Sequence, residues 1–314
     1  MNPPAPQPGQ VATARSARVA ASRKLLRRAV RREQQAFLAD GPQAVREALR
    51  FHGSAGGAAH PNGLCVHVEE VYVDAALTER HAELLALAAQ RSVPAVHCDA
   101  KAIASLSDAV TPQGILARCA TLDVPLHTLV DNGRRPLETS QDDNARIHRP
   151  RLLAVPVDVR DPGNLGTIIR CADASGSDGI AVLGDSVDVY NPKTVRSTAG
   201  SLFHSPIAVQ GDTVAAIRSM QAGGLQVIAT EGEASLDLDD AIDTGRLERP
   251  TAWLFGNEAH GLPDEIAGLA DLRIRIPIRG LAESLNLSTA AAICLFASAR
   301  AHRWPPGMTL GGHR

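Results

Sequence analysis

Long apolar segments and paired cysteines are absent from this sequence. No apolar run in its 314 residues approaches the roughly 20 residues that a membrane-spanning helix needs. The N-terminus is rich in proline and then in arginine, without the apolar stretch of a secretory signal. We therefore expect a cytoplasmic protein that has free thiols and no structural zinc. The five cysteines form no CxxC pair and are Cys65, Cys98, Cys119, Cys171 and Cys294.

The motifs of several enzyme classes are also missing. No GK[ST] follows a glycine loop, which excludes a P-loop, and there is no GxSxG, HExxH or metal-spaced cluster, so we expect no metal. The segment Asp161-Pro-Gly-Asn-Leu-Gly166 follows a predicted strand and opens a predicted helix, as a dinucleotide-binding loop does. It has only two of the three glycines of GxGxxG. A nicotinamide dehydrogenase therefore stays open as an alternative, which NADH binding would reveal.

Charge is unevenly distributed along the chain. The whole sequence is 44% hydrophobic with a net charge of −2, which suits a globular protein and by itself indicates no polyanionic partner. Residues 15–32, however, carry eight basic residues and no acid. The segment is either a solvated face or an arm that contacts RNA phosphates, and we favour the arm, with residues 1–14 disordered. Its candidate RNA-binding residues are Arg23, Lys24, Arg27, Arg28, Arg31 and Arg32.

Residues 33–130 alternate between strand and helix patterns and predict a small α/β domain. We expect strands near residue 35 and at 65–73, 93–97 and 114–119, with helices from Pro42 and at 77–90 and 99–106. Residues 131–150 are polar, have turn signals and lack an apolar period, which indicates a linker.

A second domain is predicted over residues 151–303, with a tail at 304–314. Buried strands are expected at 152–157, 179–183, 202–209, 225–230, 252–255 and 272–276, separated by helices. Asn164 is the expected N-cap of the first of these helices, and Arg170 lies off its apolar stripe. This alternation predicts a mostly parallel sheet covered on both faces.

Two glycine-bearing polar loops follow the last two predicted strands. They span residues 256–261 and 277–286. An open α/β sheet places its ligand at such strand ends, and we expect these two strands to be neighbours. Glycine allows backbone N–H and C=O groups to approach a ligand closely. The two loops therefore predict a binding site.

Three ordered segments carry a resemblance to a known family. They are Asn164…Arg170, Gly256–Leu262, and Ile276-Pro-Ile…Ser284-Leu-Asn-Leu-Ser288-Thr-Ala-Ala. Together they resemble the signature motifs of the SpoU (TrmH-like) branch of the SPOUT RNA methyltransferases, over residues 152–302. Residues 33–130 resemble the ribosomal-protein-like (L30e-like) substrate-binding domain of the ribosomal-RNA members, including the thiostrepton-resistance type, through Phe37-Leu-Ala-Asp-Gly-Pro and Gln113-Gly-Ile. Two departures are Asn257, where a serine or other small polar residue is more usual, and His260.

The resemblance implies a fold and a function. It implies a C-terminal trefoil knot and a homodimer. The implied reaction is transfer of the methyl group of S-adenosylmethionine (SAM) to a ribose 2′-hydroxyl, and the favoured substrate is 23S ribosomal RNA. A tRNA 2′-O-methyltransferase and a non-catalytic RNA-binding ribosome-assembly factor are the alternatives. The implied catalytic residues are Arg170, Glu258, Asn164, Ser284 and Asn286. The implied cofactor-binding residues, which act mainly through their backbone, are Thr230, Gly256, Asn257, Gly261, Ile276, Ile278 and Leu285.

Several implied site residues also have an ordinary structural interpretation. Arg170 would then be an exposed helix arginine and Glu258 a loop carboxylate. Ser284 and Asn286 would cap the last helix. The ordered trio of motifs favours the functional interpretation.

Overall fold

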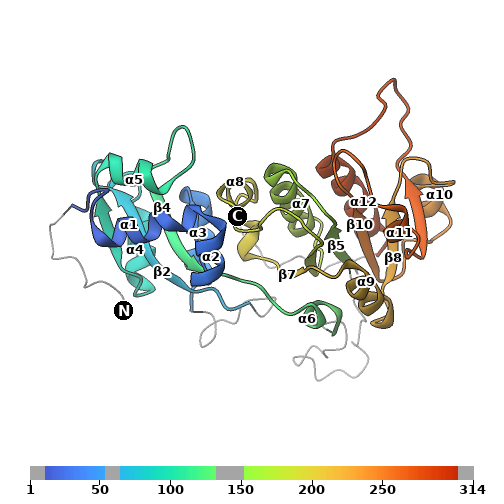
Figure 1. Ribbon diagram of the computed structural model, residues 1–314, viewed down its shortest axis with the longest axis horizontal. Coiled ribbons are helices and arrows are strands. Elements are labelled where there is room, and N and C mark those ends of the chain that lie inside the picture. Colours follow the sequence, from blue (N-terminus) through green and yellow to red (C-terminus); the bar gives the residue numbers. More distant parts are fainter. Residues whose placement is uncertain (1–10, 54–63, 132–151, 303–314) are drawn as a thin grey trace. The chain divides into compact units, whose positions relative to one another are not determined.

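The computed structural model describes residues 11–53, 64–131 and 152–302 (Figure 1). The chain divides into two compact units. The N-terminal unit contains the residues up to 123 together with 160–170 and 187–206, and the C-terminal unit contains 124–159, 171–186 and the residues from 207 onward. This division differs from the predicted one, because two segments of the predicted second domain group with the first. Nearly all of the predicted linker, residues 1–10 and the predicted tail lie outside the described residues. Residues 11–14 depart from the predicted disorder, because Ala12 N–H donates to His97 O at 2.7 Å.

A four-stranded sheet forms the centre of the N-terminal unit. The strand order is β1-β4-β2-β3; β4 is antiparallel to β1 and β2, and β2 is parallel to β3. The predicted alternation is confirmed, except that the predicted helix 77–90 begins only at Ala82, after a 3₁₀ turn capped by Asp74. The elements are β1 (Ala36–Asp40), α3 (Pro42–Phe51), β2 (Val68–Asp74), α4 (Ala82–Gln90), β3 (Ala95–Cys98), α5 (Ala100–Leu106) and β4 (Ile115–Ala120).

The basic segment is part of this unit. It forms α1 (Ala17–Arg23), a 3₁₀ turn (Lys24–Leu26) and α2 (Arg28–Gln34). Val19 and Leu25 are buried in the same core as Tyr72 of β2. Burial of these apolar side chains anchors the helices to the sheet, so the predicted domain start at residue 33 is too late.

Two further elements belong to the N-terminal unit although they come much later in the chain. They are α8 (Pro192–Ser197) and a 3₁₀ turn (Ser201–Phe203). The ring of Phe37 on β1 lies 4.6 Å from the ring of Tyr190 and 6.1 Å from that of Phe203, measured between centroids. Because residues 201–203 form this 3₁₀ turn, the strand that was predicted at 202–209 begins only at Ile207.

All neighbouring strands of the C-terminal unit are parallel, which confirms the prediction of a mostly parallel sheet. The order of its seven strands is β7-β6-β5-β10-β8-β11-β9. The strands are β5 (Leu152–Pro156), β6 (Gly179–Leu183), β7 (Ile207–Gln210), β8 (Gln226–Thr230), β9 (Leu236–Asp237), β10 (Thr251–Phe255) and β11 (Leu272–Arg275).

Helices connect most of these parallel strands, and β5 and β10 are completely buried. The buried indole of Trp253 on β10 donates from Nε1 to Ser298 Oγ of the last helix at 2.8 Å. In the described part of the chain no helix is long and apolar enough to cross a membrane. The helices are α6 (Leu126–Asp131), α7 (Pro162–Ala174), α9 (Thr213–Ala222), α10 (Leu238–Asp243), α11 (Asp264–Ala267) and α12 (Leu287–Ala301).

The strand order corrects one prediction about the site. The strands that precede the two glycine loops, β10 and β11, are not neighbours, because β8 pairs with both of them. The chain runs outward from β5 through β6 to β7, and the later strands lie on the other side of β5. The direction of winding therefore reverses between β5 and β10, which is the position where open α/β sheets bind ligands.

Candidate active site at the ends of the parallel strands

The loop after β10 is a tight turn closed by its own backbone. Asn257 N–H donates to Gly261 O at 2.9 Å, and Gly261 N–H donates to Asn257 O at 2.8 Å. The side-chain Oδ1 of Asn257 accepts from Ala259 N–H at 2.9 Å. Gly261 has a φ of +67°, a conformation in which glycine carries no steric penalty. These contacts fix the loop and leave the side chains of Glu258 and His260 exposed.

Gly256 is required by the closeness of this turn. A Cβ atom at position 256 would lie 2.3 Å from the carbonyl carbon of Gly261 and 2.4 Å from the backbone nitrogen of Leu262. Both neighbours are backbone atoms, so the side chain cannot be accommodated by a rotamer change. Any larger residue would therefore open the turn.

Asn257 also ties this turn to the loop that follows β5. Its Nδ2 donates to the backbone oxygen of Asp158 at 2.9 Å. The residue before Asp158, Val157, donates from its backbone N–H to Phe255 O at 2.8 Å. Asp158 has a φ of +53°, which an aspartate tolerates better than most residues. Its Oδ1 accepts from Asp185 N–H at 2.7 Å, in the loop after β6.

Asp158 is a residue of this site that sequence reasoning missed. It makes the ends of β5, β6 and β10 one connected structure. The amide of Asn257 is occupied by these contacts, so this predicted cofactor-binding residue shapes the loop with its side chain.

Thr230 joins the end of β8 to the same edge of the sheet. Its Oγ1 donates to Leu254 O of β10 at 3.0 Å, and the following residue, Glu231, donates from N–H to Ile274 O of β11 at 3.1 Å. Thr230, Gly256 and Ile276 therefore lie at the ends of three strands in one parallel sheet. The structure brings these three predicted cofactor-binding positions together.

The segment between β11 and α12 is the most exposed part of the candidate site. Ser284 and Asn286 are exposed, and the apolar side chains of Ile278, Leu281 and Leu285 are exposed to 40%, 104% and 37%. Asn286 Oδ1 accepts from the N–H groups of Ser288 and Thr289 at 2.9 and 3.3 Å. Asn286 is thus the N-cap of α12, which is its ordinary structural interpretation.

The first turn of α7 corrects the role of Asn164. Oδ1 of Asp161 accepts from Asn164 N–H at 2.8 Å, so Asp161 caps the helix and Asn164 lies within it. Burial alone would raise the pKa of Asp161, but hydrogen bonds from the backbone N–H of Asn164 and from Lys193 Nζ outweigh burial and lower it. The predicted N-cap was wrong. Asp and Asn are both common N-caps and lie only three residues apart here, so the sequence pattern does not distinguish Asp161 from Asn164.

Arg170 is exposed, as its position off the apolar stripe predicts, whereas Ile168 and Ile169 are buried. At about 1.5 Å of rise per residue it lies about 9 Å along the axis of α7 from Asn164. Both residues belong to the N-terminal unit, and the other predicted catalytic residues, Glu258, Ser284 and Asn286, belong to the C-terminal unit.

The predicted RNA-binding residues divide into two kinds. Arg23, Lys24, Arg27, Arg28 and Arg32 are exposed. Arg31 is buried, and its Nε and Nη2 donate to Asp188 Oδ2 at 2.9 and 2.5 Å while Nη1 donates to Leu25 O at 2.8 Å. Arg31 therefore departs from the prediction, because its guanidinium is already used inside the N-terminal unit.

Two family models cover most of the chain. The model of the SpoU rRNA Methylase family matches residues 151–296, and the MRM3-like substrate binding domain matches residues 16–117. The second match begins in the basic segment, in agreement with the burial of Val19 and Leu25.

Individual proteins are similar over most of their length. The chain is 29% identical over 255 residues to a 23S rRNA (guanosine-2′-O-)-methyltransferase of Nitrosomonas europaea, which is 80% of this chain and 89% of that protein. It is 29% identical to the 23S rRNA (guanosine(2553)-2′-O)-methyltransferase of Bacillus subtilis, over 91% of this chain and 98% of that one. The crystal structure of an AdoMet-bound rRNA methyltransferase from Sinorhizobium meliloti is similar with a TM-score of 0.70 and 30% identity, covering 93% of this chain and 98% of that chain.

Proposed function

Because the chain belongs to the SpoU rRNA methylase family, we propose that it methylates a ribose 2′-hydroxyl of 23S ribosomal RNA with SAM as the methyl donor. The observation that carries the proposal is the placement of the motif loops. The loop at Gly256–Gly261 and the segment from Ile276 both follow strands of one parallel sheet, and the first of these strands, β10, borders the point where the winding of the sheet reverses.

The residues at this edge fit the cofactor. The turn after β10 is held by backbone contacts so close that Gly256 admits no Cβ, and the segment after β11 exposes backbone and apolar side chains together. We assign SAM binding to the backbone around Thr230, Gly256, Gly261 and Ile276, with Ile278 and Leu285 packing on its apolar parts. Asn257 holds the turn in shape. When bound, SAM supplies a methyl group on a sulfonium, which is already activated for transfer.

Arg170 is the catalytic residue of this proposal. A guanidinium keeps its proton near neutral pH because its positive charge is delocalised over three nitrogens, so it does not act as the base. Arg170 binds the phosphate next to the target ribose and stabilises the negative charge that develops on the 2′-oxygen. The proton leaves to phosphate or to water.

The other predicted catalytic residues position the substrate. Glu258 orients the RNA through its carboxylate, and Asn164 contacts the ribose or a phosphate through its amide. Ser284 offers a hydroxyl from an exposed position before the cap of α12. Asn286 holds the start of that helix in place.

Exposed cations support structured RNA as the substrate. Arg23, Lys24, Arg27, Arg28 and Arg32 are exposed in the N-terminal unit, whose matching domain model is a substrate-binding domain. Such a surface grips RNA by shape and phosphate charge. This extra unit favours ribosomal RNA over tRNA.

The trefoil knot and the homodimer stay part of the proposal. The exposed apolar side chains of Ile293 and Phe296 on α12 support an interface between two copies of the chain. A subunit interface beside α12 would lie close in sequence to Ser284 and Asn286. Each active site would then be completed in the dimer.

Two measurements test the proposed function. Calorimetry should detect SAM binding and no NADH binding. Mapping of 2′-O-methylation in cells with and without the protein should show one or more ribosomal RNA sites that disappear with it. A change confined to tRNA would establish the tRNA alternative, and SAM binding without any methylation change would indicate the non-catalytic alternative.

A further inference from the structure

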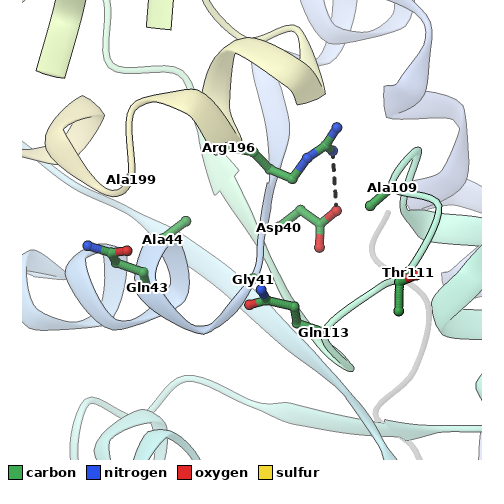
Figure 2. Close-up of a pocket in the computed structure, with 9 residues that line it drawn as sticks. All are labelled: Asp40, Gly41, Gln43, Ala44, Ala109, Thr111, Gln113, Arg196 and Ala199. Atoms are coloured by element: carbon green, nitrogen blue, oxygen red, sulfur yellow. Dashed lines mark hydrogen bonds and ion pairs between the residues drawn. The ribbon is translucent and has the colours of Figure 1, made fainter. Parts of the chain in front are cut away.

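The N-terminal unit contains a cavity that the proposed active site does not use. Its volume is about 270 Å³. Figure 2 shows the residues around it, which come from the end of β1, the start of α3, the loop before β4 and the end of α8. The lining residues are Asp40, Gly41, Gln43, Ala44, Ala109, Thr111, Gln113, Arg196 and Ala199.

Small residues keep the cavity open. Gly41 has a φ of +98° and turns the chain from β1 into α3, and a Cβ there would lie 3.3 Å from Oε1 of Gln113. Ala44, Ala109 and Ala199 add only methyl groups to the wall. Ala199 has a φ of +51°, which is unfavourable for a residue with a Cβ and is seen most often where the surrounding structure demands it.

An acid and a guanidinium face each other in the cavity wall. Asp40 is 7% exposed, and its Oδ2 accepts from Ser107 Oγ at 2.5 Å. The same oxygen accepts from Arg196 Nη1 at 3.4 Å (Figure 2). Arg196 Nη1 also pairs with Asp108. Asp40 and Asp108 therefore share one nitrogen, Nη1, of a guanidinium that has five N–H donors in all. Within the described residues the remaining edge of Arg196 is therefore available to a ligand.

Three of the residues that line the cavity are exposed and polar. They are Gln43, Thr111 and Gln113, and their side chains supply both donors and acceptors. Ala44, Ala109 and Ala199 add apolar methyl groups to the same lining. A lining of this composition suits a flat ring that is apolar on its faces and polar on its edge.

We propose that this cavity receives one unstacked guanine base of the bound RNA. Arginine pairs with the O6 and N7 acceptors of guanine. The N–H groups on the opposite side of the base can then donate to the side-chain amide oxygens of Gln43 and Gln113. The volume lies below the about 300 Å³ at which pockets for whole drug-sized ligands begin, so a single ring system is the matching size.

This inference rests on the proposed function, because it requires RNA as the substrate. It adds a contact that fixes the register of the RNA on the N-terminal unit. Recognition of an extruded base by its edge gives sequence information that phosphate contacts on the basic helices lack.

Photo-crosslinking tests the proposal on the full-length protein. The probes are 23S ribosomal RNA transcribed with 6-thioguanosine and, separately, with 4-thiouridine. We expect 6-thioguanosine to cross-link to the peptide that contains Ala109–Gln113, and 4-thiouridine to give no cross-link there. Cross-links confined to other peptides, or equal for both probes at this one, would overturn the proposal.

A blocking variant and a matched control complete the test. Thr111→Trp places a large side chain at the exposed mouth, and we expect it to abolish this cross-link and weaken RNA binding at least tenfold with unchanged SAM affinity. Gln113→Ala should weaken RNA binding, whereas Gln90→Ala, an exposed glutamine at the end of α4, should not. Unchanged RNA binding in Thr111→Trp would contradict the proposal. If the wild-type protein methylates the RNA without this cross-link, the cavity proposal fails and the proposed function stands; if it methylates no RNA, the proposed function fails.

Discussion

Asn257 donates from its side-chain Nδ2 to the backbone oxygen of Asp158 at 2.9 Å and thereby joins the loops that follow β10 and β5. The two strands are parallel neighbours on either side of the point where the winding of the sheet reverses. One side chain therefore joins two of the loops at the edge of the sheet where the methyl donor is proposed to bind.

The first prediction concerns this hydrogen bond. Asn257→Ala removes a donor and an acceptor that hold the loop, and Asn257→Asp removes the donor alone. Each hydrogen bond contributes about 1 kcal/mol, so we expect Asn257→Ala, which loses two, to weaken SAM binding about 30-fold and Asn257→Asp, which loses one, about fivefold. Calorimetry with SAM checks both values. His260→Ala, in the same loop, is the control, and wild-type SAM affinity in Asn257→Ala would show that the loop is held by other contacts.

The second prediction concerns the close approach at Gly256. Gly256→Ala forces the turn open because the new Cβ would overlap backbone atoms of Gly261 and Leu262. Overpacking of this kind costs about 1–3 kcal/mol, so we expect a lower thermal midpoint together with loss of SAM binding. Gly280→Ala is the matched control, since no atom lies within 4 Å of its Cβ position. Equal behaviour of the two variants would contradict the prediction.

The third prediction separates the charge of Arg170 from its shape. We expect Arg170→Ala to lower kcat about 100-fold, because removal of one group that stabilises charge in a transition state has an effect of this size. Arg170→Lys keeps the charge but loses the planar fork, and we expect a loss of at least about tenfold. SAM affinity should stay unchanged in both variants. Arg218→Lys, an exposed arginine of α9, is the control, and near-normal activity of Arg170→Lys would remove the need for a guanidinium.

The fourth prediction distinguishes the exposed arginines from the buried one. A triple change of Arg27, Arg28 and Arg32 to glutamine should lower RNA affinity and reduce the salt dependence, since each phosphate contact contributes about 0.7–0.9 to the slope of log K against log salt. Arg31→Gln should instead destabilise the fold by about 3 kcal/mol, because it leaves Asp188 without its buried partner. Filter binding at several salt concentrations and denaturant unfolding check the two effects. An unchanged slope in the triple variant would exclude the basic helices from RNA binding.

The fifth prediction follows from the pKa of Glu47. His204 Nε2 lies 3.1 Å from Glu47 Oε2, and this hydrogen bond, larger than the opposing effect of burial, lowers the pKa of Glu47 below 4.5. A carboxyl whose pKa is lowered by folding stabilises the folded state above its unfolded pKa and loses that effect as the pH falls. Wild type should therefore be more stable than Glu47→Gln at pH 7, and the difference should shrink below about pH 4.5. Urea unfolding across this range checks the prediction, with Glu33→Gln as the exposed control; a difference independent of pH would contradict it.

The sequence by itself determined the local structure and the chemistry of the motifs. Short apolar runs identified β5, β8 and β10, and the alternation of strands with helices predicted a parallel sheet, because parallel neighbours need a crossover between them. The glycine at 256 was expected to allow close approach of a ligand, and the structure shows that the backbone of Gly261 and Leu262 also requires it. The apolar stripe of α7 placed Arg170 on the exposed side of its helix.

Only the tertiary structure decided which distant residues meet. The insertion of β8 between β10 and β11 depends on strand pairing, which the pattern within each strand does not encode. Arg31 reads as one more cation of a basic segment until Asp188, 157 positions away, takes its guanidinium. The cavity beside Asp40 arises in the same way, because Arg196 reaches it from a helix far along the chain. A sequence fixes what each segment can bury, and the packing of the whole chain fixes what is buried against it.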